Sequence, residues 1–370
     1  MSESKLESAK TACKRLNVST QTLYAYVSRG LIRSTVDATD SRKRQYSSID
    51  VTHLIERQNK GRSRKSVAQS TIDFGEPVLQ SNVSSIAKGQ FYYHGQNAVE
   101  LSRKMTLEAV FELLCNIRIS SSVDADKQVY ISQQARPLDR FIDSFSKEAI
   151  RNKSQGNKNH ALRLLKLMAS NAAQQPPNGR LIHQQLAEAW SSDPRAADLI
   201  RRALVLSADH ELNASTYAAR ITASAGATLP ACLLTGISTL SGVEHGGITD
   251  RCLAWMSKMS ESDIADIEIS KQSPPPGFGH RLYPDGDPRS IEILHNCPPP
   301  SSWTNLCKQV VAISGYHPTL DYGLATLEHQ LKLPKGSGFS IFAVGRTVGW
   351  LAHCFEQRRD GRLIRPRASE

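Results

Sequence analysis

From about residue 106 to residue 357 the chain is made of segments with helical periodicity, separated by short breaks at Gly and Pro. The expected helices cover residues 106–116, 138–150, 158–174, 180–190, 195–208, 213–226, 229–240, 245–259, 288–296, 301–313, 319–331 and 338–357. The alternation typical of a β-strand occurs only at 89–94 and 127–131. Two Pro-Pro-Pro runs, at 274–276 and 298–300, exclude regular helix at either end of the segment between them. The sequence therefore predicts a mainly α-helical body.

Length and composition are those of a globular protein. With 370 residues, two or three domains are expected. Hydrophobic residues make up 39% of the chain and charged residues 22%, which excludes wholesale disorder. No run approaches the roughly 20 apolar residues that a membrane-spanning helix needs, and the N-terminal residues contain no apolar signal core. We expect a cytoplasmic protein with no membrane partner.

The cysteines indicate neither a disulfide framework nor a zinc site. There are seven of them, and no two are spaced as CxxC. They stand at positions 13, 115, 232, 252, 297, 307 and 354. We expect reduced thiols and no metal.

The net charge of +11 is concentrated at the N-terminus. Residues 1–65 hold 14 Lys and Arg against 6 Asp and Glu, a net of +8, which leaves +3 for the rest of the chain. In this basic head, helices are expected over residues 6–16, 20–28 and 50–58, with a break at 17–19 and a basic loop at 42–44. This order predicts a helix-turn-helix with the basic loop beside it as a wing.

The runs TACKRLNVSTQTLYAYVSRGLI and SRKRQYSSIDVTHLIER resemble the winged helix-turn-helix domain of the mercury-resistance-regulator (MerR) family. The resemblance covers about 60 residues and implies contact with DNA. The residues expected to face bases or neutralise phosphates are Thr20, Gln21, Tyr24, Arg29, Arg42, Lys43 and Arg44. The alternative is a small helical protein-interaction module whose basic run is a solvated face.

A linker separates this head from the body. Residues 61–72 are polar and basic and show no apolar period, which is typical of a flexible connection. The winged helix-turn-helix domain is therefore assigned to residues 1–60, and the domain boundary lies near residue 72.

Four groups of polar residues stand out in the helical body. They are Asp209–Thr216, Glu244–Gly247, Pro276–Arg281 with Asp287–Arg289, and Asp321 at the head of an apolar helix. Taken singly, each has an ordinary structural explanation, such as a helix N-cap or a hydrogen-bonded core histidine. Arg346 differs, because it lies within an apolar helix where a buried guanidinium needs an anionic partner. Together, three histidines, a carboxylate and several arginines indicate proton transfer beside a carbonyl of a polycarboxylate.

The runs SADHELNASTYAAR, EHGGITD, PPPGFGHRLYPDGDPR, TLDYGLA, FAVGRTVGWLAH and GRLIRPR closely resemble the motifs of citrate synthases, in the order of that family. FYYHGQNAVEL resembles the family's N-terminal segment, so the resemblance spans about residues 89–367. It implies an acyltransferase that performs the Claisen condensation of acetyl-CoA with oxaloacetate, giving citrate and CoA, as in the tricarboxylic acid cycle.

The resemblance also implies a role for each matching residue. Asp321 would remove a methyl proton from acetyl-CoA, His210 would donate to the thioester oxygen, and His280 would protonate the oxaloacetate carbonyl oxygen. Oxaloacetate would be bound by His245, Arg289 and Arg346, and by Arg365 entering from the partner subunit. The CoA adenine would meet backbone groups of Pro276, Gly277, Phe278 and Gly279.

The fold implied by the resemblance is an all-α homodimer whose small domain closes over the substrate on a large domain. The large domain would comprise residues 73–208 and 326–370, and the small domain residues 209–325. No metal or redox cofactor is required, because the CoA thioester is itself a substrate.

Two stretches depart from the family pattern. Val243 and Glu244 precede His245, which puts a negative charge beside a dicarboxylate site, and Ile248–Asp250 replace the family's usual Ala-Asn stretch. Two alternatives therefore stay open. One is a transcription regulator that uses the citrate-synthase body as a sensor of oxaloacetate or acyl-CoA, and the other is a 2-methylcitrate synthase that uses propionyl-CoA.

Overall fold

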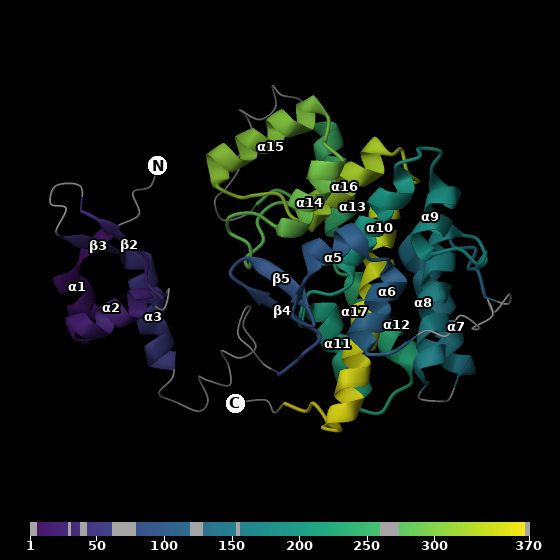
Figure 1. Ribbon diagram of the computed structural model, residues 1–370, viewed down its shortest axis with the longest axis horizontal. Helices are drawn as coiled ribbons and strands as arrows, with labels where there is room; N and C mark the ends of the chain where they lie inside the picture. Colours follow the sequence, from purple (N-terminus) through teal and green to yellow (C-terminus); the bar gives the residue numbers. More distant parts are fainter. Residues whose placement is uncertain are drawn as a thin grey trace. The chain divides into compact units, whose positions relative to one another are not determined.

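The computed structural model describes residues 6–28, 31–37, 43–60, 79–118, 129–152, 156–259 and 274–366. The chain forms two compact units, Met1–Gln80 with Arg367–Glu370, and Ser81–Pro366 (Figure 1). The segment expected to be a linker, residues 61–72, lies outside the described residues.

The described part of the N-terminal unit combines three helices with a small sheet. Its elements are β1 (Leu6–Ser8), α1 (Ala9–Leu16), α2 (Thr20–Ser28), β2 (Ser34–Val36), β3 (Arg44–Ser47) and α3 (Ser48–Lys60). The strands pair antiparallel in the order β1-β3-β2. The core of the unit is formed by Ala12, Leu16, Leu23, Ile32, Tyr46, Val51 and Leu54.

The first helix begins later than the sequence predicted. Ser8 caps α1 by accepting the N–H of Thr11 at 3.2 Å, and Leu6–Ser8 pair with β3 as a strand. The helix ends at Asn17, whose left-handed backbone (φ 54°) makes the predicted break.

The second unit, over its described residues, is a helical body with one short sheet. Its strands are β4 (Ser84–Ala87), β5 (Gln90–Tyr93) and β6 (Gln96–Asn97), paired antiparallel in that order. Its helices are α5 (Ala98–Lys104), α6 (Leu107–Cys115), α7 (Pro137–Arg151), α8 (Lys158–Ala173), α9 (Ile182–Trp190), α10 (Ala196–Ser207), α11 (Ala214–Ser224), α12 (Leu229–Leu240), α13 (Ile248–Lys258), α14 (Pro288–Asn296), α15 (Ser301–Ser314), α16 (Leu320–Gln330) and α17 (Ser337–Asp360). The prediction of a mainly helical body is confirmed.

Helix α17 is the centre of the body. It is buried along most of its 24 residues and packs against α6, α8, α10, α11, α12 and α16 (Figure 1, yellow). A helix that is apolar on all sides is stable in water only when other elements surround it. A second, smaller core lies between α13, α15 and α16 and includes Met256, Trp303 and Tyr322.

Each helix predicted between residues 106 and 357 is present, with its ends within three residues of the expected ones. The short helix α5 was not predicted. Residues 129–131, expected in a strand over 127–131, form none, because Asn171 of α8 binds this segment instead. Its Nδ2 donates to the carbonyl of Tyr130 at 2.9 Å, and its Oδ1 accepts the N–H of Ser132 at 2.9 Å. Residues 127 and 128 lie outside the described residues.

The division of the body into a large and a small domain stays a prediction. Helices α11 and α12, which fall within the predicted small domain, contribute apolar side chains to the main core together with α17. No helix among the described residues is both long and apolar enough to cross a membrane.

Candidate active site

His210 is buried where the end of α10 meets α17. Gly349 of α17 donates its N–H to the carbonyl of Ala208 at 2.9 Å. A side chain at Gly349 would collide there, because its Cβ would lie 2.2 Å from Oδ1 of Asp209. Nε2 of His210 forms a hydrogen bond of 2.8 Å with the Tyr283 hydroxyl. The glycine thus lets the segment that carries His210 run directly along the central helix.

Two glycines fold the loop that carries His280. Gly277 and Gly279 have left-handed backbones, with φ of +86° and +77°. Gly279 donates its N–H to the carbonyl of His317 at 2.9 Å, and Thr319 donates its N–H to the carbonyl of Gly277 at 2.8 Å. These bonds hold the loop beside the segment that leads into α16.

The His210 and His280 rings form one cluster with Tyr283. The centre of the His280 ring lies 5.2 Å from that of His210 and 5.0 Å from that of Tyr283. Nδ1 of His280 accepts the N–H of Leu282 at 3.2 Å, which assigns the hydrogen of the neutral ring to Nε2.

Both imidazoles are neutral at pH 7. Burial, with the Arg289 charge adding to it, lowers the pKa of His280 to about 4. Burial also takes the pKa of His210 well below its usual range, and Arg289 and His280 lower it further. Neutral rings in this position can donate a hydrogen bond to an oxygen without carrying a permanent charge.

Arg289 lies in the first turn of α14 and is paired with the residue that caps that helix. Its Nε and Nη2 donate to the two carboxylate oxygens of Asp287 at 2.9 and 2.8 Å. Asp287 also accepts the N–H of Leu320 at 3.0 Å, so one carboxylate joins the beginnings of α14 and α16. The guanidinium carbon lies 5.5 Å from the centre of the Tyr283 ring, next to the histidine cluster.

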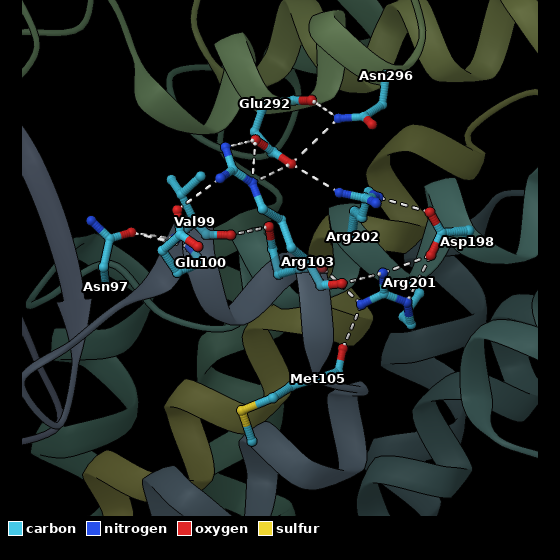
Figure 2. Close-up of polar contacts among 11 residues, drawn as sticks. Asn97, Val99, Glu100, Arg103, Met105, Asp198, Arg201, Arg202, Glu292 and Asn296 are labelled. Carbon is cyan, nitrogen blue, oxygen red and sulfur yellow. Dashed lines mark hydrogen bonds and ion pairs between the residues drawn. The ribbon is translucent and has the colours of Figure 1, made fainter.

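Glu292 anchors α14 to the rest of the body (Figure 2). This buried carboxylate accepts hydrogen bonds from Nη2 of Arg103 on α5 at 2.8 Å and from Nη1 of Arg202 on α10 at 2.9 Å. Asp198, Arg201, Glu100 and Asn296 extend the same network. Because α10 leads to His210 and the first turn of α14 carries Arg289, the network helps to set the position of these two side chains relative to each other.

Arg346 presents a buried positive charge with unused hydrogen-bonding capacity. It is 1% exposed on α17, and its Nε donates to the carbonyl of Ser207 at 3.0 Å. Its Nη2 is buried with no hydrogen-bond partner within the described part of the chain. Burial lowers the pKa of Arg346 to about 10, against the opposing effect of Asp209, so the group remains protonated at pH 7. Such a group suits an anionic ligand.

His245 and Arg346 both lie near the ring of Phe342. Its ring centre is 6.0 Å from that of Phe342, and the Arg346 guanidinium carbon is 4.8 Å from the same ring. Nε2 of His245 donates to Oγ of Ser215 at 2.8 Å, because the Ser215 hydroxyl itself donates to Asn213. Burial, with Arg346 adding to it, lowers the pKa of His245 to about 4.

Asp321 stands in the first turn of α16, where the helix dipole favours a negative charge. Its Oδ1 accepts a hydrogen bond of 2.6 Å from the hydroxyl of Thr249. Burial raises the pKa of Asp321, although Thr249 and Arg289 act in the opposite direction. A partly desolvated carboxylate of this kind is a stronger base than an exposed one.

A buried polar network supports the segment beneath His210. Oδ2 of Asp209 accepts a hydrogen bond from Ser84 and lies 3.2 Å from Nε2 of His353 on α17. Arg220 lies 3.1 Å from the other ring nitrogen of His353 and pairs with Glu356 at 2.6 Å. Burial raises the pKa of Asp209, but the neighbouring His353 and Arg346 outweigh it and leave the pKa lowered.

The structure thus brings His210, His245, His280, Arg289, Asp321 and Arg346 into one electrostatically connected cluster. Arg365 is not part of it within one chain and lies exposed beyond the end of α17. In the loop Pro276–Gly279, Phe278 is buried, and the Gly279 N–H and Gly277 carbonyl are bonded within the protein. Backbone contacts with a CoA adenine would have to use other groups of this loop.

Sequence reasoning missed the partners of these residues. Tyr283 bonds His210, and Asp287 bonds Arg289. Both lie in the run PPPGFGHRLYPDGDPR together with His280 and Arg289, and this closeness to predicted site residues was the signal that could have found them. Ser215 and Thr249 contact residues 30 and 72 positions away, which no local pattern reveals. Among the residues that the structure describes, no group of three or more His, Cys, Asp and Glu is arranged to hold a metal ion.

The residues expected to contact DNA lie on two elements of the N-terminal unit. Thr20, Gln21 and Tyr24 are exposed on α2, with Tyr24 54% exposed, and Lys43 and Arg44 are exposed at β3. An open groove of about 780 Å³ is lined by Tyr24, Lys43 and Arg44 among others. Arg29 and Arg42 lie outside the described residues.

Comparison with known proteins matches the body to one family. The family model "Citrate synthase, C-terminal domain" matches residues 74–367. "Citrate synthase 2" of Bacillus subtilis (strain 168) is 27% identical over 347 residues, covering 80% of this chain and 93% of the relative. The citrate synthase of Haloferax volcanii is 35% identical over 187 residues, which are 46% of this chain and 49% of the relative.

Solved structures show the same fold. The crystal structure of citrate synthase from Thermotoga maritima MSB8 matches with a TM-score of 0.68 and 21% identity, over 80% of this chain and 94% of that one. A ternary complex of carboxymethyl coenzyme A and oxaloacetate with citrate synthase from Thermoplasma acidophilum matches with a TM-score of 0.68 and 19% identity, over 79% and 93%.

Proposed function

The chain belongs to the citrate synthase family, a family of acyltransferases, and we propose that it condenses acetyl-CoA with oxaloacetate to give citrate and CoA. Citrate synthases need no cofactor beyond their CoA substrate. The proposal rests on one observation: two neutral histidines and a carboxylate of raised pKa share a cluster with two buried arginines. The histidines and the carboxylate provide the proton transfers, and the arginines attract a dicarboxylate.

The first step is removal of a methyl proton from acetyl-CoA. Asp321 takes this proton, and negative charge develops on the thioester oxygen. Tyr283 occupies Nε2 of His210, which leaves Nδ1 for the substrate. With the Tyr283 hydroxyl donating to Nε2, the neutral ring carries its hydrogen on Nδ1 and donates it to the thioester oxygen.

The second step joins the two substrates. The enolate carbon attacks the keto carbon of oxaloacetate, and the Nε2–H of His280 protonates the carbonyl oxygen as the carbon–carbon bond forms. Water then hydrolyses the citryl thioester, which releases CoA and citrate.

The two arginines hold the oxaloacetate carboxylates. Arg346 offers Nη2, which has no hydrogen-bond partner among the described residues, and Arg289 offers a guanidinium oriented by Asp287. His245 adds a third contact, and the loop Pro276–Gly279 meets the CoA adenine. We further infer a homodimer in which Arg365, exposed beyond α17, completes the site of the partner subunit.

Product analysis tests the proposed reaction. The purified protein is incubated with oxaloacetate and either acetyl-CoA or propionyl-CoA, and the products are identified by mass spectrometry. The proposal predicts citrate and a higher kcat/KM for acetyl-CoA. Preferential formation of 2-methylcitrate would contradict the choice of acyl group, and oxaloacetate binding without any product would indicate a sensor instead of an enzyme.

We also infer that the N-terminal unit is a winged helix-turn-helix that binds DNA. The basic head and the exposed polar residues on α2, next to a groove lined by Lys43 and Arg44, support this inference. Binding of labelled duplexes is measured by fluorescence anisotropy across a range of salt concentrations. Lys43→Ala and Arg44→Ala should each weaken binding and lower the salt slope by about one. Lys104→Ala, an exposed change on α5, is the control, and salt-independent or absent binding would favour a protein-interaction module.

A further inference from the structure

Two helices begin side by side at the Asp321 carboxylate. Asp321 is the second residue of α16, Thr249 is the second residue of α13, and these helices pack against each other. Thr249 is 2% exposed and donates its hydroxyl hydrogen to Oδ1 of Asp321 at 2.6 Å. Oδ2 of Asp321 accepts no hydrogen bond from another residue in the described part of the chain.

The Thr249 side chain is held in one orientation by its methyl group. This methyl lies against Gly338 of α17, where a Cβ would come within 2.9 Å of it. A β-branched side chain in a helix has few rotamers, so fixing the methyl also fixes the hydroxyl. The hydroxyl is therefore directed at Asp321 before any substrate binds.

On the basis of the function proposed above, we propose that Thr249 is the positioning residue for the base. Its hydroxyl fixes Oδ1 of Asp321, leaves Oδ2 to take the methyl proton, and stabilises the ionised carboxylate.

The charges around Asp321 determine what loss of the hydroxyl would do. Arg289 and Asp287 act on it from α14 with opposite signs, Arg346 acts from α17, and the Cys252 thiol lies on α13. Burial is the largest influence and raises the pKa of Asp321, whereas the Thr249 hydrogen bond lowers it. Loss of the hydroxyl removes the hydrogen bond that lowers the pKa of Asp321, so burial raises this pKa further.

Two substitutions separate the hydroxyl from the rest of the side chain. Thr249→Val keeps the shape and removes the donor, whereas Thr249→Ser keeps the donor and removes the methyl. In Thr249→Val the acidic limb of the kcat–pH profile should move to higher pH by about one unit, with oxaloacetate affinity changed less than about twofold. Thr249→Ser keeps the donor but loses the methyl that orients it, so the limb should move in the same direction by less than half as much, under about 0.5 unit. An unmoved limb in Thr249→Val, or an equal shift in both variants, would overturn the proposal.

A second readout does not depend on turnover. Infrared titration of the protonated carboxyl band, assigned by its loss in Asp321→Asn, reports the protonation midpoint of Asp321 directly. The midpoint should be higher in Thr249→Val than in the wild type, and equal midpoints would overturn the role of Thr249 even in a protein without activity. Absence of turnover in the wild type would instead contradict the proposed function. If Thr249→Val does not fold, Thr249→Ala supplies the same comparison.

Discussion

Burial, more than any single neighbouring charge, sets the chemistry of the individual site residues. It keeps His210 and His280 neutral and makes Asp321 a stronger base, because desolvation disfavours the charged form of each group. Their positions were predictable from the sequence motifs. Their protonation was not, because it depends on segments that come together only in the fold.

The buried histidines should make the protein less stable in acid. His245 and His280 have a pKa of about 4 in the folded protein against 6.5 as the ordinary value. Between these pH values the unfolded chain binds more protons, so the free energy of unfolding falls as the pH falls from 6.5 to 4. Thermal melting across this range checks the prediction. In the double variant His245→Gln/His280→Gln, the free energy of unfolding should depend less steeply on pH, with proton uptake on unfolding reduced by at most about two. An unchanged slope would contradict the prediction.

Arg346 should contribute far more to oxaloacetate binding than to stability. Arg346→Gln should weaken oxaloacetate binding by roughly 10- to 100-fold, because a charge-assisted pair with a carboxylate is lost. The Tm should fall slightly, because the substitution removes the Nε hydrogen bond to Ser207 and a cation that stabilises the buried Asp209 carboxylate. Calorimetric titration and thermal melting measure both effects. Arg180→Gln, an exposed change on the N-terminal side of α9, is the control, and equal affinity in both variants would refute the role of Arg346.

At the scale of elements, hydrophobic periodicity predicted the helices, but it did not predict which distant residues would contact each other. The helices around α17 were predicted because their apolar faces repeat along the chain. The ion pairs that Glu292 of α14 forms with Arg103 and Arg202 were not predicted, because Glu292 and Arg103 are 189 residues apart in the sequence. Residues 129–131, the described part of the strand expected over 127–131, form no strand for a related reason: Asn171 on α8 makes hydrogen bonds that a neighbouring strand would have made.

Because Glu292 holds α14 in place, we expect it to affect both stability and substrate binding. Glu292→Gln removes the charge shared by Arg103 and Arg202 and should cost about 1–3 kcal/mol of unfolding free energy. Oxaloacetate KM should rise several-fold with a smaller change in kcat, since Arg289 lies one turn earlier on α14. Glu100→Gln removes an exposed partner of the same Arg103 and should change stability by less than about 0.5 kcal/mol. Denaturant titrations measure stability and steady-state kinetics measure KM and kcat. Similar effects of the two substitutions would contradict the role of Glu292 in holding α14 in place.

At the scale of the whole molecule, the family resemblance accounts for the body, and the head remains a prediction. The motif order from residue 89 to residue 367 was sufficient to predict the helical fold around one site. The homodimer stays a proposal, because the structure contains one chain and Arg365 lies outside the cluster of site residues in that chain.

The homodimer can be tested by mass and by complementation. Sedimentation equilibrium should give twice the chain mass of 40.8 kDa. Asp321→Asn and Arg365→Gln should each be inactive alone, and exchange of subunits between them should restore part of the activity, because one mixed site then has both groups. A monomeric active enzyme, or no recovery on mixing, would contradict a site shared between subunits.

The central claim is that this cluster catalyses a condensation, and thiol release tests it most directly. The account predicts that CoA is released only when oxaloacetate and an acyl-CoA are both present. In Asp321→Asn the rate should fall by roughly 10²- to 10⁴-fold while the circular dichroism spectrum is unchanged. No thiol release from a folded wild-type protein, or an undiminished rate in Asp321→Asn, would contradict the account.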